Sequence, residues 1–170
     1  MTATVTPTLG PKDQWTVTAT VVGPMMVIGD EDVLHFLHLP GSFAAADFDP
    51  DRAGTPAAVG AARRQIDAYF AGTLTEFSLP LDPAGTDFQR RVWMALADIP
   101  FGATESYGAL AGRVGNPKAS RAVGLANGRN PLPLVLPCHR VIGANGNLTG
   151  YGGGLPLKKK LLDHERRLAS

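Results

Sequence analysis

The sequence predicts an α+β protein in two parts, a small N-terminal sheet followed by a mainly helical C-terminal half. Three short strand-like runs, separated by Gly-Pro or acidic turns, all precede residue 41. After residue 85, segments bounded by Gly or Pro repeat apolar residues at helical spacing. The charge changes at the same point. Residues 1–85 carry 4 Lys+Arg and 10 Asp+Glu, net −6, whereas residues 86–170 carry 12 and 5, net +7.

The N-terminal half begins with a Thr- and Pro-rich segment, residues 1–12, which we expect to be a disordered or loosely attached leader. Strands are predicted at 15–21, 25–28 and 33–39, and a loop at 41–56. A helix follows, with an apolar stripe of Ala62, Ile66, Tyr69 and Phe70. These elements define a sheet domain over residues 13–85.

The C-terminal half, residues 86–170, begins with a helix whose N-terminus Thr86 and Gln89 can cap as a capping box. Pro100-Phe101-Gly102 ends this helix. Two short helices come next. Ser106 is a suitable cap for the first, and Asn116-Pro117 for the second.

The second short helix has two different faces, which together suggest a helix-turn-helix. Its predicted core face consists of Ala119, Ala122, Val123 and Ala126. Arg121 lies nearly opposite, and its outer neighbours Pro117, Gly124 and Gly128 leave the backbone almost bare. Such a surface could approach a DNA groove and insert one guanidinium, and the basic half favours a nucleic-acid partner. A plain helical hairpin with scattered surface charge would give the same pattern.

The composition excludes several classes of protein. No apolar run approaches the roughly 18 residues of a membrane helix, and the N-terminus lacks a signal pattern. The single cysteine excludes an internal disulfide and a multi-cysteine zinc site. We therefore expect a cytoplasmic protein with no membrane partner, no cofactor and no metal. His35 and His38 are interpreted as structural.

The single cysteine, Cys138, is followed directly by His139. A thiol reacts as its thiolate, so a nearby base is needed, and His139 could act directly or through a water. Adjacent residues cooperate only at a bend, which Pro137 favours. A buried structural cysteine is the alternative.

Glu165 lies at the edge of the apolar stripe of the last helix, which Leu157, Leu161 and Leu168 form. Its own helix offers no partner, so His139 is a candidate, in a Glu–His–water–Cys chain. A solvated carboxylate without a partner is equally compatible with the pattern.

Glycines are concentrated in residues 143–154, with a hairpin turn expected at Asn145-Gly146. This segment lacks the Lys-Ser/Thr ending of a phosphate-binding loop. It could bring backbone N–H groups close to a flat ligand, or it could be flexible without a function.

Together these motifs resemble the methylated-DNA–protein-cysteine methyltransferases, also called alkylguanine-DNA alkyltransferases. The resemblance runs from about residue 86 to 165. Its motifs are Ser106-Tyr107, Arg121-Ala122-Val123-Gly124, Asn130-Pro131, Pro137-Cys138-His139-Arg140-Val141 and Tyr151-Gly152-Gly153. The N-terminal half resembles the family mainly in layout, and residues 1–12 do not resemble it.

The resemblance implies a ribonuclease-H-like sheet domain and a helical domain that holds the active site. It implies that Cys138 accepts the alkyl group, His139 and Glu165 activate it, and Asn130 braces the turn. Tyr107 would rotate the target nucleotide, while Arg121 fills its place in the stack. Ala122 and Gly124 would contact DNA with them. Val141, Tyr151, Gly152 and Gly153 would line the base pocket, where some relatives carry serine in place of Gly152.

The implied enzyme is a methylated-DNA–[protein]-cysteine S-methyltransferase that acts once and is consumed. It would take an alkyl group from guanine O6 in double-stranded DNA, with thymine O4 left open as a second substrate. We expect a monomer, and clustering on DNA is left open. Two other functions are alternatives to this one. Alkyltransferase-like proteins bind such lesions but lack the acceptor cysteine, and a Cys-His hydrolase would not need the Arg121 helix.

Overall fold

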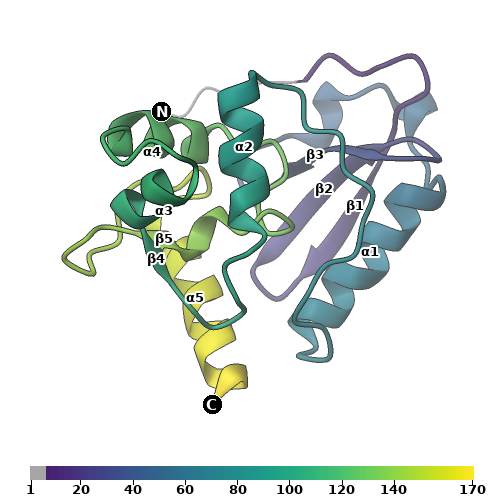
Figure 1. The fold of residues 1–170 in the computed structure, drawn as a ribbon. Helices are drawn as coiled ribbons and strands as arrows, with labels where there is room; N and C mark the ends of the chain where they lie inside the picture. Colours follow the sequence, from purple (N-terminus) through teal and green to yellow (C-terminus); the bar gives the residue numbers. More distant parts are fainter. Residues whose placement is uncertain (1–6) are drawn as a thin grey trace. The chain divides into compact units, whose positions relative to one another are not determined.

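The computed structural model describes residues 7–170, which divide into two compact units that meet in the chain at Pro83 and Ala84. The first contains a three-stranded sheet and a long helix, and the second is mainly helical (Figure 1). The predicted α+β fold class is confirmed. No helix in the described part of the chain combines the length and the apolar character needed to cross a membrane.

The sheet of the first unit is antiparallel and has the order β1-β2-β3 (Figure 1). The strands are β1 (Gln14–Thr20), β2 (Gly23–Gly29) and β3 (Leu34–His38). In the central strand β2, Met25–Ile28 are fully buried, which explains why they read as a continuous apolar run. Val17 lies opposite Met26 across the β1–β2 pair.

Helix α1 (Ala57–Phe70) packs against all three strands. Thr18 faces this helix, where it is buried and donates a hydrogen bond to Asp67 at 3.3 Å. Trp15 and Val17 pack instead with Met26, Ile28 and Phe48. Both faces of β1 are therefore covered, and its alternating pattern does not separate a buried face from a solvated one. Val21, at the end of the predicted strand, is 80% exposed in the hairpin.

The segment expected to be a loosely attached leader differs from that expectation over residues 7–12, while residues 1–6 lie outside the described residues. Leu9 packs against the cluster of Met26, Ile28 and Phe48. Arg52 donates hydrogen bonds to the carbonyls of Gly10 and Asp13. This arginine ends a short 3-10 helix, η2 (Pro50–Arg52); a second, η1 (Ala45–Asp47), also lies inside the predicted loop.

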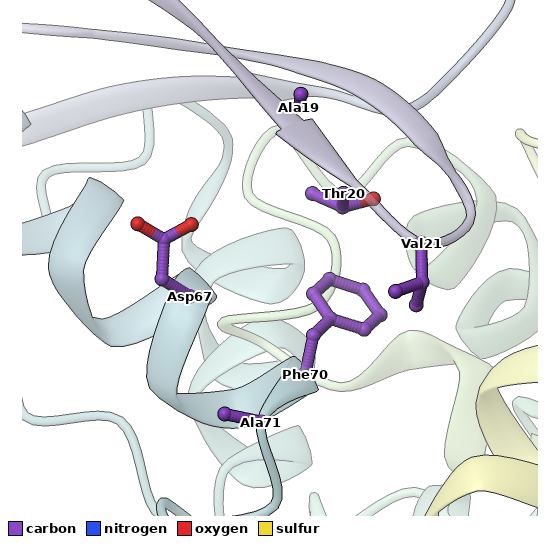
Figure 2. Close-up of a pocket in the computed structure, with 6 residues that line it drawn as sticks. All are labelled: Ala19, Thr20, Val21, Asp67, Phe70 and Ala71. Carbon is purple, nitrogen blue, oxygen red and sulfur yellow. The ribbon is translucent and has the colours of Figure 1, made fainter.

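The first unit also has a shallow hollow of about 420 Å³ beside the β1–β2 hairpin (Figure 2). It is lined by Ala19, Thr20, Val21, Asp67, Phe70 and Ala71. Phe70 and Val21 point toward one another across it. Asp67 supplies the only charged group of the lining, and Thr18 already donates a hydrogen bond to that carboxylate.

The second unit contains four α-helices: α2 (Asp87–Leu96), α3 (Tyr107–Arg113), α4 (Ser120–Gly128) and α5 (Leu155–Ala169). A two-stranded parallel sheet joins β4 (Glu105–Ser106) to β5 (Val141–Ile142). Strands of two residues have too little alternation to be recognised in a sequence. Trp93 on α2 is almost fully buried and donates its ring N–H to the carbonyl of Ala126 on α4 at 2.7 Å.

The predicted helix-turn-helix is formed by α3 and α4, and Ser106 caps α3 by accepting a hydrogen bond from the Ala109 N–H. Helix α4 begins later than expected, because Pro117 lies in a turn that the Asn116 carbonyl closes with the Ala119 N–H. The predicted core face is partly wrong. Ala122 is exposed, and the buried residues are Val123, Ala126 and Asn127.

The predicted capping box at the start of α2 is confirmed. Thr86 accepts a hydrogen bond from the Gln89 N–H at 3.2 Å, and the Gln89 side chain accepts one from the Thr86 N–H at 2.9 Å. We predict that Thr86→Ala lowers the free energy of unfolding by about 1 kcal/mol, because a helix donor loses its partner. Urea denaturation measures the change. The exposed Thr104→Ala is the control, and equal effects of both substitutions would contradict a capping role.

Candidate active site

The loop before Cys138 is shaped by Asn130. Its amide donates to the Leu136 carbonyl at 2.7 Å and accepts from the Leu132 N–H at 2.9 Å. Leu134, inside this loop, has a φ of +74°, and no other non-glycine residue in the described chain has a positive φ. Such a backbone persists only where surrounding contacts hold it.

The chain then turns through a short 3-10 helix, η3 (Cys138–Arg140). The bend predicted at Pro137 is therefore present, and the Cys138 and His139 side chains are 4% and 0% exposed. The turn is built between α5 and α2, both of which pack against it.

Glu165 of α5 has several buried partners. His139 Nε2 lies 2.6 Å from its Oε1, and Arg140 donates from Nε to Oε2 and from Nη2 to Oε1, both at 2.9 Å. The Gly102 N–H also donates to Oε2, at 3.2 Å. Of the two arrangements that the sequence left open, the structure has the pairing with His139.

The buried face of α5 differs from the predicted stripe. Glu165 is fully buried, whereas Leu168 is 41% exposed. Lys158, Leu162 and His164 are buried beside Leu157 and Leu161. The spacing of apolar residues does not locate this face, because Lys158 and Glu165 belong to it. Both carry charges, and their partners are distant in sequence.

The hydrogen bonds of this cluster determine its protonation. Burial alone would raise the pKa of Glu165, but its bonds to His139 and Arg140 outweigh that effect and hold the pKa at about 2. Burial lowers the pKa of His139, against the opposing effect of Glu165. A neutral imidazole facing an ionised carboxylate carries its hydrogen on Nε2. Its Nδ1 is then left as an acceptor.

The Cys138 thiol is protonated at rest, because burial raises its pKa to about 11. Three neighbouring influences act in the opposite direction: a hydrogen bond from Asn130, the positive charge of Lys158, and the backbone N–H groups of Cys138 and His139. The site therefore protects the thiol in the resting protein, and the thiolate forms only when a base removes the proton.

Lys158 is a site residue that the sequence analysis missed. It is fully buried, and its Nζ donates to the carbonyls of Val141 at 2.6 Å, Thr149 at 3.0 Å and Gly150 at 3.5 Å. Burial lowers its pKa. It ties the glycine-rich loop, residues 143–154, to β5 and places a positive charge near Cys138. A lysine within three consecutive lysines reads as solvated surface, so the sequence carries no signal for this role.

Tyr107, the first residue of α3, reaches the same loop. Its hydroxyl donates to the Thr149 carbonyl at 3.2 Å, and the Lys158 ammonium lies 6.0 Å from its ring centre. Tyr107 packs against α4 at Gly124, where a Cβ would lie 3.7 Å from the tyrosine ring, an ordinary van der Waals distance.

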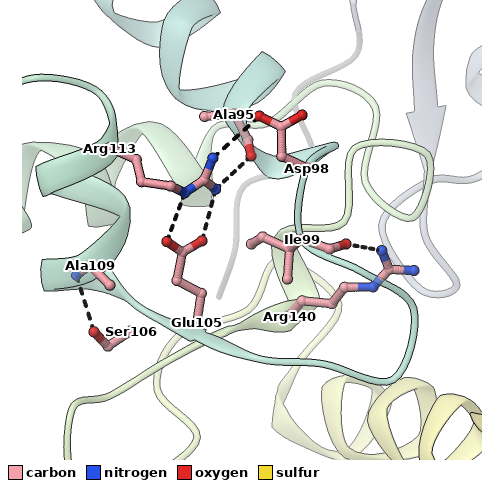
Figure 3. A network of polar contacts seen from close by, with 8 residues as sticks. All are labelled: Ala95, Asp98, Ile99, Glu105, Ser106, Ala109, Arg113 and Arg140. Atoms are coloured by element: carbon pink, nitrogen blue, oxygen red, sulfur yellow. Dashed lines mark hydrogen bonds and ion pairs between the residues drawn. The ribbon is translucent and has the colours of Figure 1, made fainter.

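Arg113 fixes the position of α3 (Figure 3). Its guanidinium donates twice to Glu105, each at 2.8 Å, and also to the Ala95 carbonyl at the end of α2. In the same view, Arg140 donates to the Ile99 carbonyl at 2.6 Å. Arg113 from α3 and Arg140 from the Cys138 turn therefore both bind the segment that follows α2, at Asp98 and at Ile99.

The outer side of α4 carries Arg121, which is exposed as predicted, together with the exposed Ala122 and the partly buried Gly124. Leu125, which the sequence analysis did not single out, is 58% exposed on the same helix. The structure thus presents one cation and a few small or apolar groups to solvent here.

The residues expected to line a base pocket lie on β5 and in the glycine-rich loop. Val141 is fully buried, Tyr151 and Gly153 are partly buried, and Gly152 is exposed. A Cβ added at Gly152 would meet no atom within 4 Å, so a serine could occupy this position without a clash. The predicted turn at Asn145-Gly146 forms, with the Gly143 N–H donating to the Asn147 carbonyl.

Among the described residues, one group of side chains could hold a metal ion: Asp13, Asp30 and His35 in the sheet unit, whose ligand atoms lie within 4.8 Å of one another. All three already have protein partners. His35 pairs with Asp13 at 3.4 Å, and Asp30 accepts two backbone N–H groups of its own turn. The ring of His38 lies against the rings of Phe43 and Phe48, with 6.0 Å between ring centres in each case.

Two family models match the chain. The model described as "6-O-methylguanine DNA methyltransferase, ribonuclease-like domain" matches residues 14–83, and the "DNA binding domain" model of the same name matches residues 87–167. A methylated-DNA–protein-cysteine methyltransferase of Mycolicibacterium paratuberculosis is 52% identical over 149 residues, which cover 86% of this chain and 88% of the relative.

Solved structures show the same similarity. The O6-methylguanine methyltransferase of Mycobacterium tuberculosis has a TM-score of 0.81 at 46% identity, covering 93% of this chain and 95% of that one. The structure of M. tuberculosis OGT in complex with DNA has a TM-score of 0.82 at 46% identity, covering 91% and 94%.

The Glu165 cluster predicts loss of stability in acid. A carboxyl whose pKa is about 2 in the folded protein and near 4.5 when unfolded stabilises the fold above pH 4.5. That contribution disappears as the pH falls toward 2, and at about 1.4 kcal/mol per pKa unit it amounts to roughly 3 kcal/mol. Urea midpoints at several pH values measure it. Glu165→Gln should make the urea midpoint less dependent on pH, and the exposed Asp163→Asn should not. If the midpoint of Glu165→Gln fell with pH as steeply as that of the unmodified protein, Glu165 would not be the source of the acid sensitivity.

Lys158 predicts a change in thiol reactivity. Lys158→Met removes a positive charge near Cys138, so the thiol pKa should rise and alkylation by iodoacetamide at pH 8 should slow by about three- to tenfold. The loop at residues 149–150 should also become more sensitive to proteolysis. Lys159→Met, at the exposed neighbouring position, should behave as the unmodified protein. A rate unaffected by Lys158→Met would show that its charge does not reach the thiol.

Proposed function

The chain belongs to the 6-O-methylguanine DNA methyltransferase family, and we propose that it repairs DNA by moving an alkyl group from guanine O6 to Sγ of its own Cys138. The observation that carries the proposal is the buried Cys138 next to the His139–Glu165 pair. This arrangement lies in the unit that the DNA-binding family model matches. A thiol, a base and a carboxylate that orients the base are the parts of an activated nucleophile.

The His139–Glu165 pair activates the thiol. The S–H bond breaks, the electron pair stays on sulfur, and the proton passes through a water to the free Nδ1 of His139. Glu165 stabilises the imidazolium that forms, because its carboxylate is ionised at neutral pH. Arg140 holds the carboxylate in place, and Asn130 braces the turn from the other side.

The thiolate then attacks the alkyl carbon. The new S–C bond forms as the C–O6 bond breaks, and the electron pair moves to guanine. Tyr107 and backbone N–H groups of the glycine-rich loop relieve the charge on the departing base. The product is a thioether, which has no easy path back to the thiol. Each molecule therefore acts once, as a methylated-DNA–[protein]-cysteine S-methyltransferase.

The target base is buried in a duplex and has to be rotated out, which requires a few kcal/mol. Helix α4 enters the minor groove with its small residues Ala122 and Gly124 against the backbone. Arg121 fills the place of the base, and Tyr107 turns the nucleotide toward Cys138. The support for this assignment is the exposed arginine on a bare helix, on the half of the chain with net charge +7.

The extruded base occupies a pocket lined by Val141, Tyr151, Gly152 and Gly153. Val141 forms the buried wall, and the loop is anchored by Lys158 and Tyr107 through the Thr149 carbonyl. Methylated thymine O4 presents the same O-alkyl group on a smaller base, so it is included as a second substrate. The partner is double-stranded DNA containing alkylated guanine, and the chain acts on it as a monomer. The chemistry requires Cys138 to remain a free thiol, as in the cytoplasm.

Stoichiometric transfer to Cys138 is the first expected result. After incubation with duplex DNA that contains O6-methylguanine, the intact mass should increase by one methylene, about 14 Da for a methyl replacing a hydrogen. Peptide mapping should place it on Cys138, and Cys138→Ser should show no gain. Continuous turnover, or transfer that survives in Cys138→Ser, would refute the proposal.

A second expected result concerns Arg121. Arg121→Ala should slow repair of duplex DNA by about ten- to a hundredfold, and leave the slower reaction with free O6-methylguanine base nearly unchanged, because only the duplex needs a stack filler. Arg129→Ala, which removes another exposed arginine of the same segment, is the control. Equal losses on duplex and free base would place Arg121 outside the extrusion step.

A further inference from the structure

Two buried polar atoms border the active-site turn without a hydrogen-bond partner among the described residues: Oδ1 of Asn127 and Nδ1 of His139. Asn127 is 5% exposed and His139 is fully buried. Buried polar atoms in native proteins nearly always bond to protein or to ordered water. Each of these atoms therefore needs a hydrogen-bond donor, and each belongs to a residue that forms or directly contacts the Cys138 turn.

The orientation of the Asn127 amide is fixed by its other end. Nδ2 donates to the Cys138 carbonyl at 3.3 Å, and this bond connects helix α4 directly to the nucleophile's own residue. The opposite orientation would set two oxygens against each other. Oδ1 is consequently an acceptor, and it belongs to a side chain anchored on the peptide that joins Cys138 to His139.

His139 Nδ1 is an acceptor for a different reason. Nε2 faces the ionised Glu165 carboxylate at 2.6 Å and therefore carries the hydrogen of the neutral ring. A water molecule has two hydrogens and can satisfy two acceptors at once. One water that donates to Nδ1 and to Oδ1 keeps a lone pair for the thiol hydrogen of Cys138.

We propose that Asn127 is a positioning residue, which with His139 holds the water that takes the Cys138 proton; this rests on the function proposed above. The S–H bond breaks with its electron pair left on sulfur, and the proton moves to the water. The water's other proton moves to Nδ1, so no further reactant is needed. Throughout the transfer, Oδ1 of Asn127 accepts a hydrogen bond from the hydrogen that stays on the water. This bond keeps the water in line between sulfur and Nδ1.

The charged and titratable groups that set the pH dependence of Cys138 reactivity come from several elements around the Cys138 turn. His139 and Arg140 belong to the turn itself, Lys158 and Glu165 face it from α5, and Tyr107 approaches through the loop from α3. On the α2 side the contact is the Ile99 carbonyl. Asn127 is the uncharged polar residue that α4 adds, so replacing it changes no charge near the thiol.

The test is the pH profile of Cys138 alkylation by iodoacetamide, which needs no DNA. Asn127→Leu is similar in size and removes both polar atoms. It should react about a hundredfold more slowly than the unmodified protein near pH 7, which is the lower end of the usual range for proton-transfer assistance. The difference should narrow as the pH approaches 11, where the thiol ionises without help. The exposed Asn116→Leu should follow the unmodified profile.

Asn127→Asp provides a second measurement if Asn127→Leu folds poorly. A buried, protonated carboxyl can donate to the Cys138 carbonyl and still offer an acceptor oxygen. Burial favours this neutral form. The Asp variant should therefore retain near-normal reactivity at pH 5–6, and its reactivity relative to the unmodified protein should fall as the carboxyl ionises.

The results separate a relay role from a structural one. An Asn127→Leu protein that is less stable but slowed equally at every pH would overturn the proposal, as would an unchanged rate. The proposed function is tested apart from this. If Cys138 accepts no methyl group from DNA, that function fails, whereas the iodoacetamide profile still decides whether Asn127 assists the thiol.

Discussion

The active-site unit depends on one buried carboxylate, that of Glu165. It accepts hydrogen bonds from Arg140 and from the Gly102 N–H, and it pairs with His139 at 2.6 Å. A buried charge of this kind is tolerated only when it is fully paired, because unpaired burial is strongly unfavourable. The same carboxylate thus holds α5, the Cys138 turn and the end of the α2 segment together. It also fixes the imidazole tautomer that leaves Nδ1 free.

A second buried charge on α5 organises the other wall of the site. Lys158 lies seven residues before Glu165, two helical turns away, and therefore on nearly the same face. It binds the carbonyls of β5 and of the glycine-rich loop. One helix thus supplies an anion that orients the base and a cation that orders the loop. In this loop Gly150 and Gly154 have a positive φ, which glycine adopts without strain, so the loop backbone can turn its carbonyls toward Lys158.

The resting site combines a buried thiol with a neighbouring buried imidazole. Burial raises the pKa of Cys138 to about 11 and lowers that of His139, so both groups are neutral at pH 7. A neutral pair avoids the desolvation penalty of a buried thiolate–imidazolium pair. Reactivity then depends on how the groups around the thiol are positioned, and the neutral amides of Asn130 and Asn127 bond to the backbone on either side of this turn, at the Leu136 and Cys138 carbonyls.

The α+β class, the capping box at Thr86, the Ser106 cap and the bend at Cys138 could be predicted from the sequence, because each depends on residues that are neighbours in the chain. The sequence also identified the basic half and the exposed Arg121. Other features required the three-dimensional structure: Glu165 is paired, Lys158 is buried, Asn127 replaces Ala122 on the inner face of α4, and the carbonyls of Gly10 and Asp13 accept hydrogen bonds from Arg52. Those contacts join residues far apart in the chain, and the stability of a buried polar group depends on partners that no local pattern contains.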